Sequence, residues 1–435
     1  MQACTDVSPH IRRIDEVGLP DVALVGGKAA HLGALRAAGL PVPDGFCVTT
    51  DAHRAHVAAA SLTSARTGEA RRAQVQRSAM PAEVTGAIHR AYAALEGVHG
   101  AGVAVAVRSS SVHEDGAAGS AAGQHDTFLQ VVGADAVVDA VRRCWASRWS
   151  DRALAYLAAR PAAVEGDSPL GVVVQVMVAA DVAGVLFTVD PLRQAEETLV
   201  LSASWGLGTV VVSGAVVPDR WVVRRDPLLV VSRHPGRKDR MLAVPPGGDR
   251  PTVETVDADR QRALCLADAA VLEVCALGLR AEAAVGAPVE VEWAAADGQV
   301  RLLQARPLAE PAAPRAGRPP VTDVSSGGGA VLQGLGASAG VAQGTARVCR
   351  TLEDAARLRS GEVLVTRETD PTWTALFPLA AAVVTEVGGL ASHAAVICRE
   401  YGLPCVTDLD GACAAIPDGA TVTVDGGSGA VVIAR

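Results

Sequence analysis

A proline- and glycine-rich stretch interrupts this sequence and most constrains how the chain can fold. Neither the 3.6-residue period of an amphipathic helix nor the two-residue period of a strand is present in residues 307–329, which read PLAEPAAPRAGRPPVTDVSSGGG. This composition is typical of a linker between globular units. We therefore predict one unit over residues 1–310, a linker over 311–332 and a second unit over 333–435.

Both flanking units alternate helix-like and strand-like stretches. Residues 27–38 place apolar side chains at helical spacing, and residues 103–107 form a β-branched run. Beyond the linker, short valine-rich runs at 361–366, 381–385 and 421–425 are separated by helical stretches. The pattern predicts an α/β or α+β architecture.

Composition excludes several classes of function. The 47 acidic and 39 basic residues give a net charge of −8, which argues against a nucleic-acid partner. The nine cysteines form no CxxC pair, so we expect reduced thiols and a cytoplasmic protein. The N-terminus has no signal-peptide pattern, and the uncharged run 199–218 contains glycines and serines typical of a buried strand, turn and strand. No membrane association is therefore expected.

A glycine pair followed by a serine and a histidine is the most informative motif. In residues 381–406 an apolar strand leads into Gly388 and Gly389, and Ser392 occupies the N-cap position of a predicted helix whose first turn contains His393. An imidazole at the positive end of a helix, beside free N–H groups, suits a phosphoryl group, and histidine is a competent nucleophile. The alternative is a histidine that only forms a hydrogen bond at a helix start.

This segment resembles the phosphohistidine motif of the PEP-utilising enzyme family, which includes phosphoenolpyruvate synthase, pyruvate phosphate dikinase and rifampicin phosphotransferase. Residues 369–374, TDPTWT, match the family's TDPxWT signal. The resemblance implies that His393 is transiently phosphorylated in a swivelling phosphohistidine domain. The expected surroundings of the histidine are Thr385, Gly388, Gly389 and Ser392. Ala391 has no hydroxyl group for the regulatory phosphorylation that some dikinases undergo two residues before the histidine.

The residues before the linker resemble the same family's nucleotide-binding domain, an ATP-grasp-like fold with two subdomains. The resemblance is carried by a GGK motif, a VRSS strand end, a Gly/Ser loop, and the EVEW and QARP strands. The implied nucleotide-binding residues are Lys28, Arg108, Ser120, Gly123, Thr127, Gln175, Met177, Glu292, Gln304 and Arg306. Glu292 and Gln304 carry hard oxygen donors suited to Mg²⁺ that bridges the ATP phosphates. Each motif taken alone has a plainer interpretation, such as a surface lysine, an ordinary loop or an edge strand.

Two departures from the family pattern affect this carry-over. Ser202 and Thr209 stand where the family usually has glutamates, which predicts altered nucleotide affinity or turnover. Ala121 replaces a common phenylalanine in the phosphate loop, which predicts a looser cover over the phosphates.

The resemblance implies a dikinase: His393 accepts the β-phosphoryl group of MgATP, AMP and phosphate are released, and the phosphoryl group passes to an acceptor. We expect the chain to lack both the acceptor-binding barrel and the antibiotic-binding domain of its relatives. The acceptor is therefore expected to be a small molecule with a hydroxyl or similar group, or to be supplied by a separate subunit. The alternatives are a phosphocarrier subunit of a split phosphotransferase, and a degenerate ATP-binding sensor.

Overall fold

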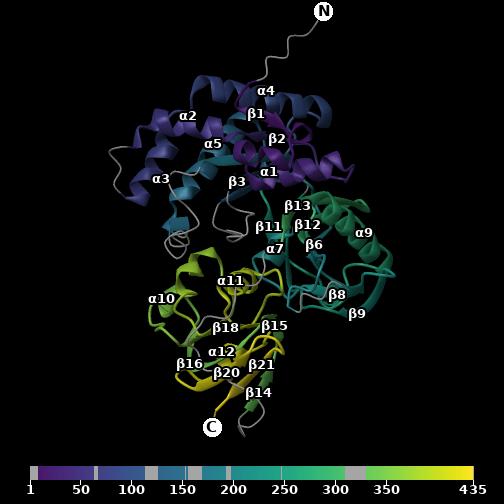
Figure 1. The fold of residues 1–435 in the computed structure, drawn as a ribbon, viewed down its shortest axis with the longest axis vertical. Coiled ribbons are helices and arrows are strands. Elements are labelled where there is room, and N and C mark those ends of the chain that lie inside the picture. The colour runs from purple at the N-terminus through teal and green to yellow at the C-terminus, as the bar shows by residue number, and fades with distance from the viewer. Residues whose placement is uncertain are drawn as a thin grey trace, which may run out of the picture. The chain divides into compact units, whose positions relative to one another are not determined.

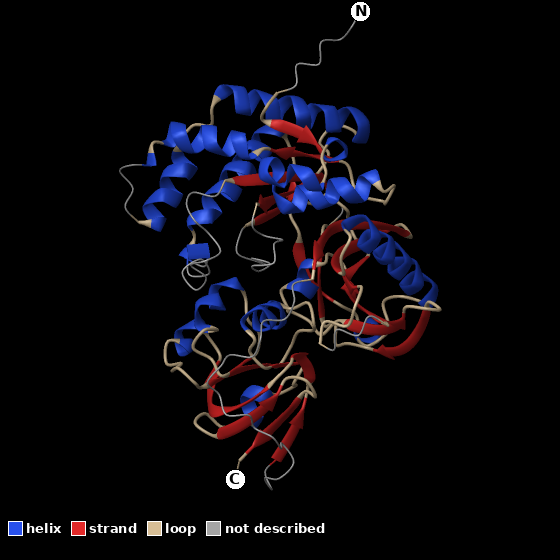
Figure 2. Ribbon diagram, in the orientation of Figure 1, coloured by secondary structure: helices blue, strands red, loops and turns tan. Residues whose placement is uncertain are grey.

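The computed structural model describes residues 8–62, 67–112, 126–151, 153–154, 169–192, 197–245, 247–308 and 330–434 (Figure 1). Helices and strands alternate along these ranges (Figure 2), and the α/β class predicted from the sequence is confirmed. No helix in the described ranges is long and apolar enough to cross a membrane. The eight cysteines that the structure describes are free thiols.

The chain divides into two compact units, neither of which is contiguous in sequence. The first comprises Met1–Ala179, Ala243–Thr252 and Leu279–Pro307, and the second comprises Ala180–Leu242, Val253–Gly278 and Leu308–Arg435. Most of the predicted linker lies outside the described residues, which resume at Ala330. The domain boundaries at residues 310 and 332 stay a prediction.

The first unit is built on a five-stranded antiparallel sheet. The strand order is β1 (Ile11–Arg13), β2 (Gly45–Val48), β5 (Leu170–Val176), β3 (Val105–Ser111) and β4 (Thr127–Val131). The helices of this unit are α1 (Val22–Ala37), α2 (Thr50–Ala60), α3 (Gly68–Arg77), α4 (Ala82–His99) and α5 (Ala134–Ala146). Phe46, Tyr92 and Trp145 lie fully buried in its core. Helix α1 covers most of the helical pattern predicted at residues 27–38.

A β-hairpin in the first unit carries three of the predicted nucleotide-binding residues, Glu292, Gln304 and Arg306. Its strands, β12 (Val289–Ala296) and β13 (Gln299–Pro307), follow helix α9 (Asp268–Val285) along the chain. Helix α1 contacts β3, β5 and β13. Residues from three distant parts of the sequence are therefore neighbours in this unit.

The second unit begins with an antiparallel sheet in the order β6 (Val182–Phe187), β7 (Thr198–Trp205), β8 (Asp219–Arg224) and β9 (Leu229–His234). The elements that follow along the chain are β10 (Arg240–Ala243), β11 (Thr252–Thr255) and α8 (Ala258–Gln261). The run 199–218 holds one strand rather than the predicted two. Gly206, at φ +74°, ends the extended chain, and the short helix α7 (Thr209–Val212) precedes β8.

An eight-stranded mixed sheet forms the C-terminal part of the second unit. Its order is β14 (Ala330–Gln333), β21 (Ala430–Ile433), β20 (Thr421–Asp425), β16 (Val341–Cys349), β17 (Val363–Thr366), β18 (Ala382–Thr385), β19 (Cys405–Thr407) and β15 (Leu335–Ser338). Strands β16 to β19 pair in parallel, and the remaining pairs are antiparallel. The helices are α10 (Leu352–Ala355), α11 (His393–Tyr401) and α12 (Ala412–Ala415).

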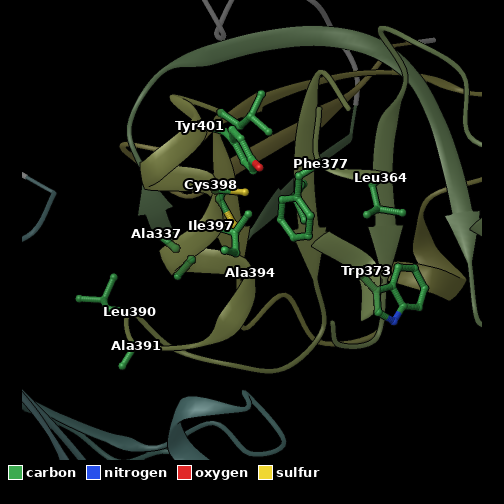
Figure 3. Packing of buried hydrophobic residues seen from close by; sticks show 14 of the residues in the cluster. Ala337, Leu364, Trp373, Phe377, Leu390, Ala391, Ala394, Ile397, Cys398 and Tyr401 are labelled. Atoms are coloured by element: carbon green, nitrogen blue, oxygen red, sulfur yellow. The ribbon is translucent and has the colours of Figure 1, made fainter. Parts of the chain in front are cut away.

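Helix α11 is fixed by its apolar face. Ile397 and Cys398 lie beside Phe377 (Figure 3), and all three are fully buried in one hydrophobic cluster. Leu364 of β17 belongs to the same cluster. This packing fixes the start of α11, where His393 lies, against the sheet.

Candidate functional site

His393 is the first residue of helix α11, at the end of a glycine-containing loop that follows β18. The N-cap is Ser392, with φ −66° and ψ 155°, and its Oγ accepts a hydrogen bond from the Ala395 N–H at 3.5 Å. Thr385 closes the loop from the other side, because its Oγ1 donates to the Val387 carbonyl at 2.8 Å. The helix start and the N-cap predicted from the sequence are confirmed.

Two threonine hydroxyls contact the imidazole of His393. Thr369 Oγ1 lies 2.9 Å from Nδ1, and Thr374 Oγ1 lies 3.2 Å from Nε2. Thr374 Oγ1 also donates its hydrogen to the Pro371 carbonyl at 2.8 Å, so it accepts from Nε2–H. Thr369 Oγ1 forms the second hydrogen bond of the ring, at Nδ1.

The TDPTWT motif gives these threonines their positions. Asp370 caps a 3₁₀ helix, Pro371–Leu376, by accepting from the Thr372 N–H at 2.7 Å. Phe377 follows this helix and contacts the imidazole edge-to-face at 5.6 Å between ring centroids. Only 7% of His393 is exposed, so an incoming group can reach a ring nitrogen only after the threonine contact at that nitrogen has opened.

The loop before His393 packs against the segment between β7 and β8 of the same unit. A Cβ atom added to Gly214 would lie 2.9 Å from Ser392 Cβ, and one added to Gly389 would lie 3.0 Å from the Pro218 ring. Gly388 has φ +113°, a conformation that favours glycine. The double glycine is thus required by close packing and by its backbone conformation.

A second group of candidate residues lies in the first unit, around Arg108 of β3. Glu292 and Gln304 are direct partners across the β12–β13 hairpin. Arg108 Nη2 donates to Glu292 Oε2 at 2.5 Å and to Gln304 Oε1 at 2.7 Å. Arg108 Nη1 donates to the Leu303 carbonyl at 2.9 Å. One guanidinium group therefore joins both residues that the sequence analysis expects to hold the metal ion.

Charged residues surround this group. Arg306 Nη2 lies 2.8 Å from both carboxylate oxygens of Glu290, and Lys28 is 5% exposed within helix α1. Although burial acts to raise it, the pKa of Glu292 lies below its usual value because Arg108, Lys28 and Arg306 stabilise the carboxylate. The group combines three cations with two carboxylates.

The remaining predicted nucleotide-binding residues are spread along β4 and β5. Gln175 lies opposite Ala106 and Arg108 lies opposite Val173 in the β3–β5 register, so Gln175 and Arg108 share one face of the sheet. Gln175 is 2% exposed, and its Nε2 has no hydrogen-bond partner among the residues described. Met177 follows β5, and Thr127 lies opposite Arg108 on β4. Ser120, Gly123 and Ala121 lie outside the described residues.

Glu290 was missed as a site residue although its sequence signal was present. Glu290 and Glu292 are two apart in a strand, which places both side chains on one face. Thr369 and Thr374 were likewise part of a noted motif without an assigned role. No sequence pattern points to the Leu303 carbonyl, because every residue has a main-chain carbonyl group.

The metal-binding prediction fits the donor chemistry of this group. A carboxylate oxygen, an amide oxygen and a main-chain carbonyl oxygen converge on the Arg108 guanidinium. Such oxygens are the ligands that Mg²⁺ prefers, and Mg²⁺ commonly completes its shell with phosphate oxygens and water. Within the described ranges, no three His, Cys, Asp or Glu side chains gather as a metal-binding cluster.

Comparison with known proteins identifies the family. The family model described as "Pyruvate phosphate dikinase, AMP/ATP-binding domain" matches residues 22–323, and "PEP-utilising enzyme, mobile domain" matches residues 358–429. The phosphoenolpyruvate synthase of Aeropyrum pernix is 35% identical over 96% of this chain and 57% of its own length. That of Pyrococcus furiosus is 33% identical over 97% of this chain and 58% of its own length.

This chain spans somewhat more than half the length of these curated relatives. Both family models lie on the regions that carry the motifs: the first runs from residue 22 into the expected linker, and the second surrounds His393. The chain therefore belongs to the PEP-utilising enzyme family, with a pyruvate phosphate dikinase-type AMP/ATP-binding domain and a mobile domain.

Proposed function

We propose that this protein is an ATP-dependent phosphotransferase of the dikinase type that phosphorylates its own His393. The position of His393 carries the proposal: it is the first residue of α11, next to a tightly packed double glycine, and threonine hydroxyls contact both ring nitrogens. A helix start offers free N–H groups to an incoming phosphoryl group. A cytoplasmic location, where ATP is abundant, accords with this function.

The cluster around Arg108 supports the nucleotide half of the proposal. Lys28, Arg108 and Arg306 supply the positive charge that phosphate oxygens require, and guanidinium groups match them in shape. Mg²⁺, held by Glu292 and Gln304, would neutralise charge on the ATP phosphates. Gln175 Nε2 lies on the same sheet face as Arg108 and has no partner in the described part of the chain, so it is a donor that a nucleotide could satisfy.

The proposed reaction has three steps. A ring nitrogen of His393 attacks the β-phosphorus of ATP, the bond to the α–β bridging oxygen breaks, and its electron pair leaves with AMP. Water then removes the γ-phosphoryl group from the pyrophosphorylated imidazole and releases phosphate. Finally an acceptor takes the remaining phosphoryl group and restores the free imidazole. Because one imidazole has to reach both the nucleotide and the acceptor, a mobile histidine domain suits this reaction.

The acceptor is the part of the proposal with several candidates. We expect a small molecule with a hydroxyl group, or a separate acceptor subunit that this chain would charge as a phosphocarrier. The curated relatives are named phosphoenolpyruvate synthase, and this name adds pyruvate to the acceptors that need testing.

A second candidate function is ATP sensing without transfer. Ser202 stands where the family usually has a glutamate, and its buried Oγ has no hydrogen-bond partner among the described residues. A missing carboxylate at this position could leave nucleotide binding intact while slowing transfer. Such a sensor would bind MgATP and never modify His393.

Mass spectrometry of the intact protein separates the two functions. After incubation with MgATP and an alkaline quench, we expect the mass of one or two added phosphoryl groups, stable in base and lost in acid. His393→Ala should show no adduct, whereas His234→Ala, which removes an exposed histidine of β9, should label normally. An adduct of equal size in His393→Ala would refute the assignment, and nucleotide binding without any adduct would favour the sensor.

A further inference from the structure

We propose that Arg108 acts as an internal cation that holds Glu292 and Gln304 in the nucleotide-free protein and has to leave them before a divalent cation can bind. Metal and nucleotide then bind interdependently, because phosphate oxygens offer Arg108 a new partner. This inference rests on the proposed function only in taking Glu292 and Gln304 as the metal ligands.

The geometry places the guanidinium group where a cation would lie. Both hydrogens of Arg108 Nη2 are used, one toward Glu292 Oε2 at 2.5 Å and the other toward Gln304 Oε1 at 2.7 Å. A metal ion bound to both oxygens would lie about 2.0–2.6 Å from each. It would therefore overlap Nη2, and the two cations exclude each other.

The third hydrogen bond keeps Arg108 in this position. Nη1 donates to the Leu303 carbonyl at 2.9 Å, so the planar group spans the strand that carries Gln304. The Arg108 side chain is 12% exposed, and little water competes for these donors. The contacts give Glu292 Oε2 and Gln304 Oε1 a cationic partner without any metal ion.

A polyphosphate changes the balance between the two cations. Lys28, Arg108 and Arg306 already stabilise the Glu292 carboxylate in the nucleotide-free protein. Phosphate oxygens add negative charge that attracts a divalent cation, and they give the guanidinium group of Arg108 a bidentate partner.

Binding of Mn²⁺ without nucleotide tests the inference directly. Free Mn²⁺ is counted by electron paramagnetic resonance during titration of the wild type, Arg108→Met and a matched control, Arg301→Met. Arg301 lies on β13 of the same hairpin, and its Nη1 donates to the Val300 carbonyl at 3.1 Å. We expect Arg108→Met to bind Mn²⁺ at least tenfold more tightly than the wild type, and Arg301→Met to match the wild type.

A double variant locates the site. Adding Glu292→Gln to Arg108→Met should abolish the gain in Mn²⁺ affinity, because it removes the carboxylate ligand. If Arg108→Met does not fold, as judged by thermal unfolding, Arg108→Gln removes the same charge, keeps a neutral donor and must show the gain. Mn²⁺ affinity equal to wild type in a folded Arg108 variant, or a gain that survives Glu292→Gln, overturns the inference.

The Mn²⁺ titration tests the inference, and adduct formation at His393 tests the proposed function, so either can be refuted without the other. If Arg108→Met gains Mn²⁺ affinity but wild-type protein never forms the adduct with MgATP, the proposed function fails and the inference stands. If the adduct forms at His393 and the Mn²⁺ affinity does not change, only the inference fails.

Discussion

A fully buried ion pair lies next to the segment between β7 and β8, against which the loop before His393 packs. Breaking this ion pair should strongly destabilise the second unit. Asp219 is the first residue of β8 and directly follows Pro218, which lies next to Gly389. Asp219 Oδ1 accepts from Lys238 Nζ at 2.5 Å, and both side chains are 0% exposed. Asp219 also accepts the Gly236 and Cys265 N–H groups, each at 2.7 Å.

Asp219→Asn leaves the Lys238 charge buried without a counter-ion. It also replaces one acceptor oxygen by an NH₂ group, which then faces a hydrogen-bond donor. Losing one partner of a buried pair costs about 3–5 kcal/mol. Because natural domains are stable by only about 5–15 kcal/mol, this loss should be visible as a large fall in the unfolding midpoint. Asp219→Leu combined with Lys238→Met should be more stable than Asp219→Leu alone, because no unpaired charge then stays buried. Recovery stays incomplete because the Gly236 and Cys265 N–H groups keep no acceptor, at about 1–3 kcal/mol each.

Urea and thermal unfolding, followed by circular dichroism, measure these changes. The control is Asp268→Asn, which removes one partner of the exposed Arg233–Asp268 pair and should leave the midpoint near that of the wild type. The reasoning is refuted if Asp219→Asn loses less than about 1 kcal/mol, or if the double variant is no more stable than Asp219→Leu alone.

Three further predictions concern the site and pH dependence. Glu292→Ala should abolish labelling of His393 by MgATP without changing the circular dichroism spectrum, and normal labelling would mean that the metal site is elsewhere. Thr369→Val and Thr374→Val should each slow adduct formation about three- to tenfold, the equivalent of one hydrogen bond, and serine at either position should restore the rate; unchanged rates would show that the threonines do not orient the imidazole. Burial raises the pKa of Asp408 from 3.8 to about 6, so its protonated form stabilises the folded state at low pH, and this stability is lost as the pH rises from about 4 through 6. Asp408→Asn should remove that slope, worth up to about 3 kcal/mol, and a wild-type slope in this variant would assign it to another group.

Local sequence signals predicted the backbone structure around His393 well. Glycines, an N-cap serine and an apolar helical face act over a few residues, so the start of α11 could be inferred from residues 388–401 alone. The strand and helix around Lys28 and Arg108 were inferred on the same basis.

Contacts between distant residues could not be predicted in this way. Arg108 is 184 residues from Glu292 and 196 from Gln304, and no periodicity indicates that they meet. Arg306 was expected to contact phosphates, and its pairing with Glu290 was not foreseen because a strand pattern gives a face but not a partner. The discontinuous units also depend on long-range packing.

The origin of the phosphoryl group on His393 is the most direct test of the proposed reaction. ATP radiolabelled at either the β- or the γ-phosphate is incubated with the protein and Mg²⁺, and the protein and the nucleotides are separated at alkaline pH. The dikinase reaction predicts that label from the β-phosphate stays on His393 while AMP accumulates, and that γ-label is released as phosphate. Label from the γ-phosphate alone, with ADP as the nucleotide product, would contradict it.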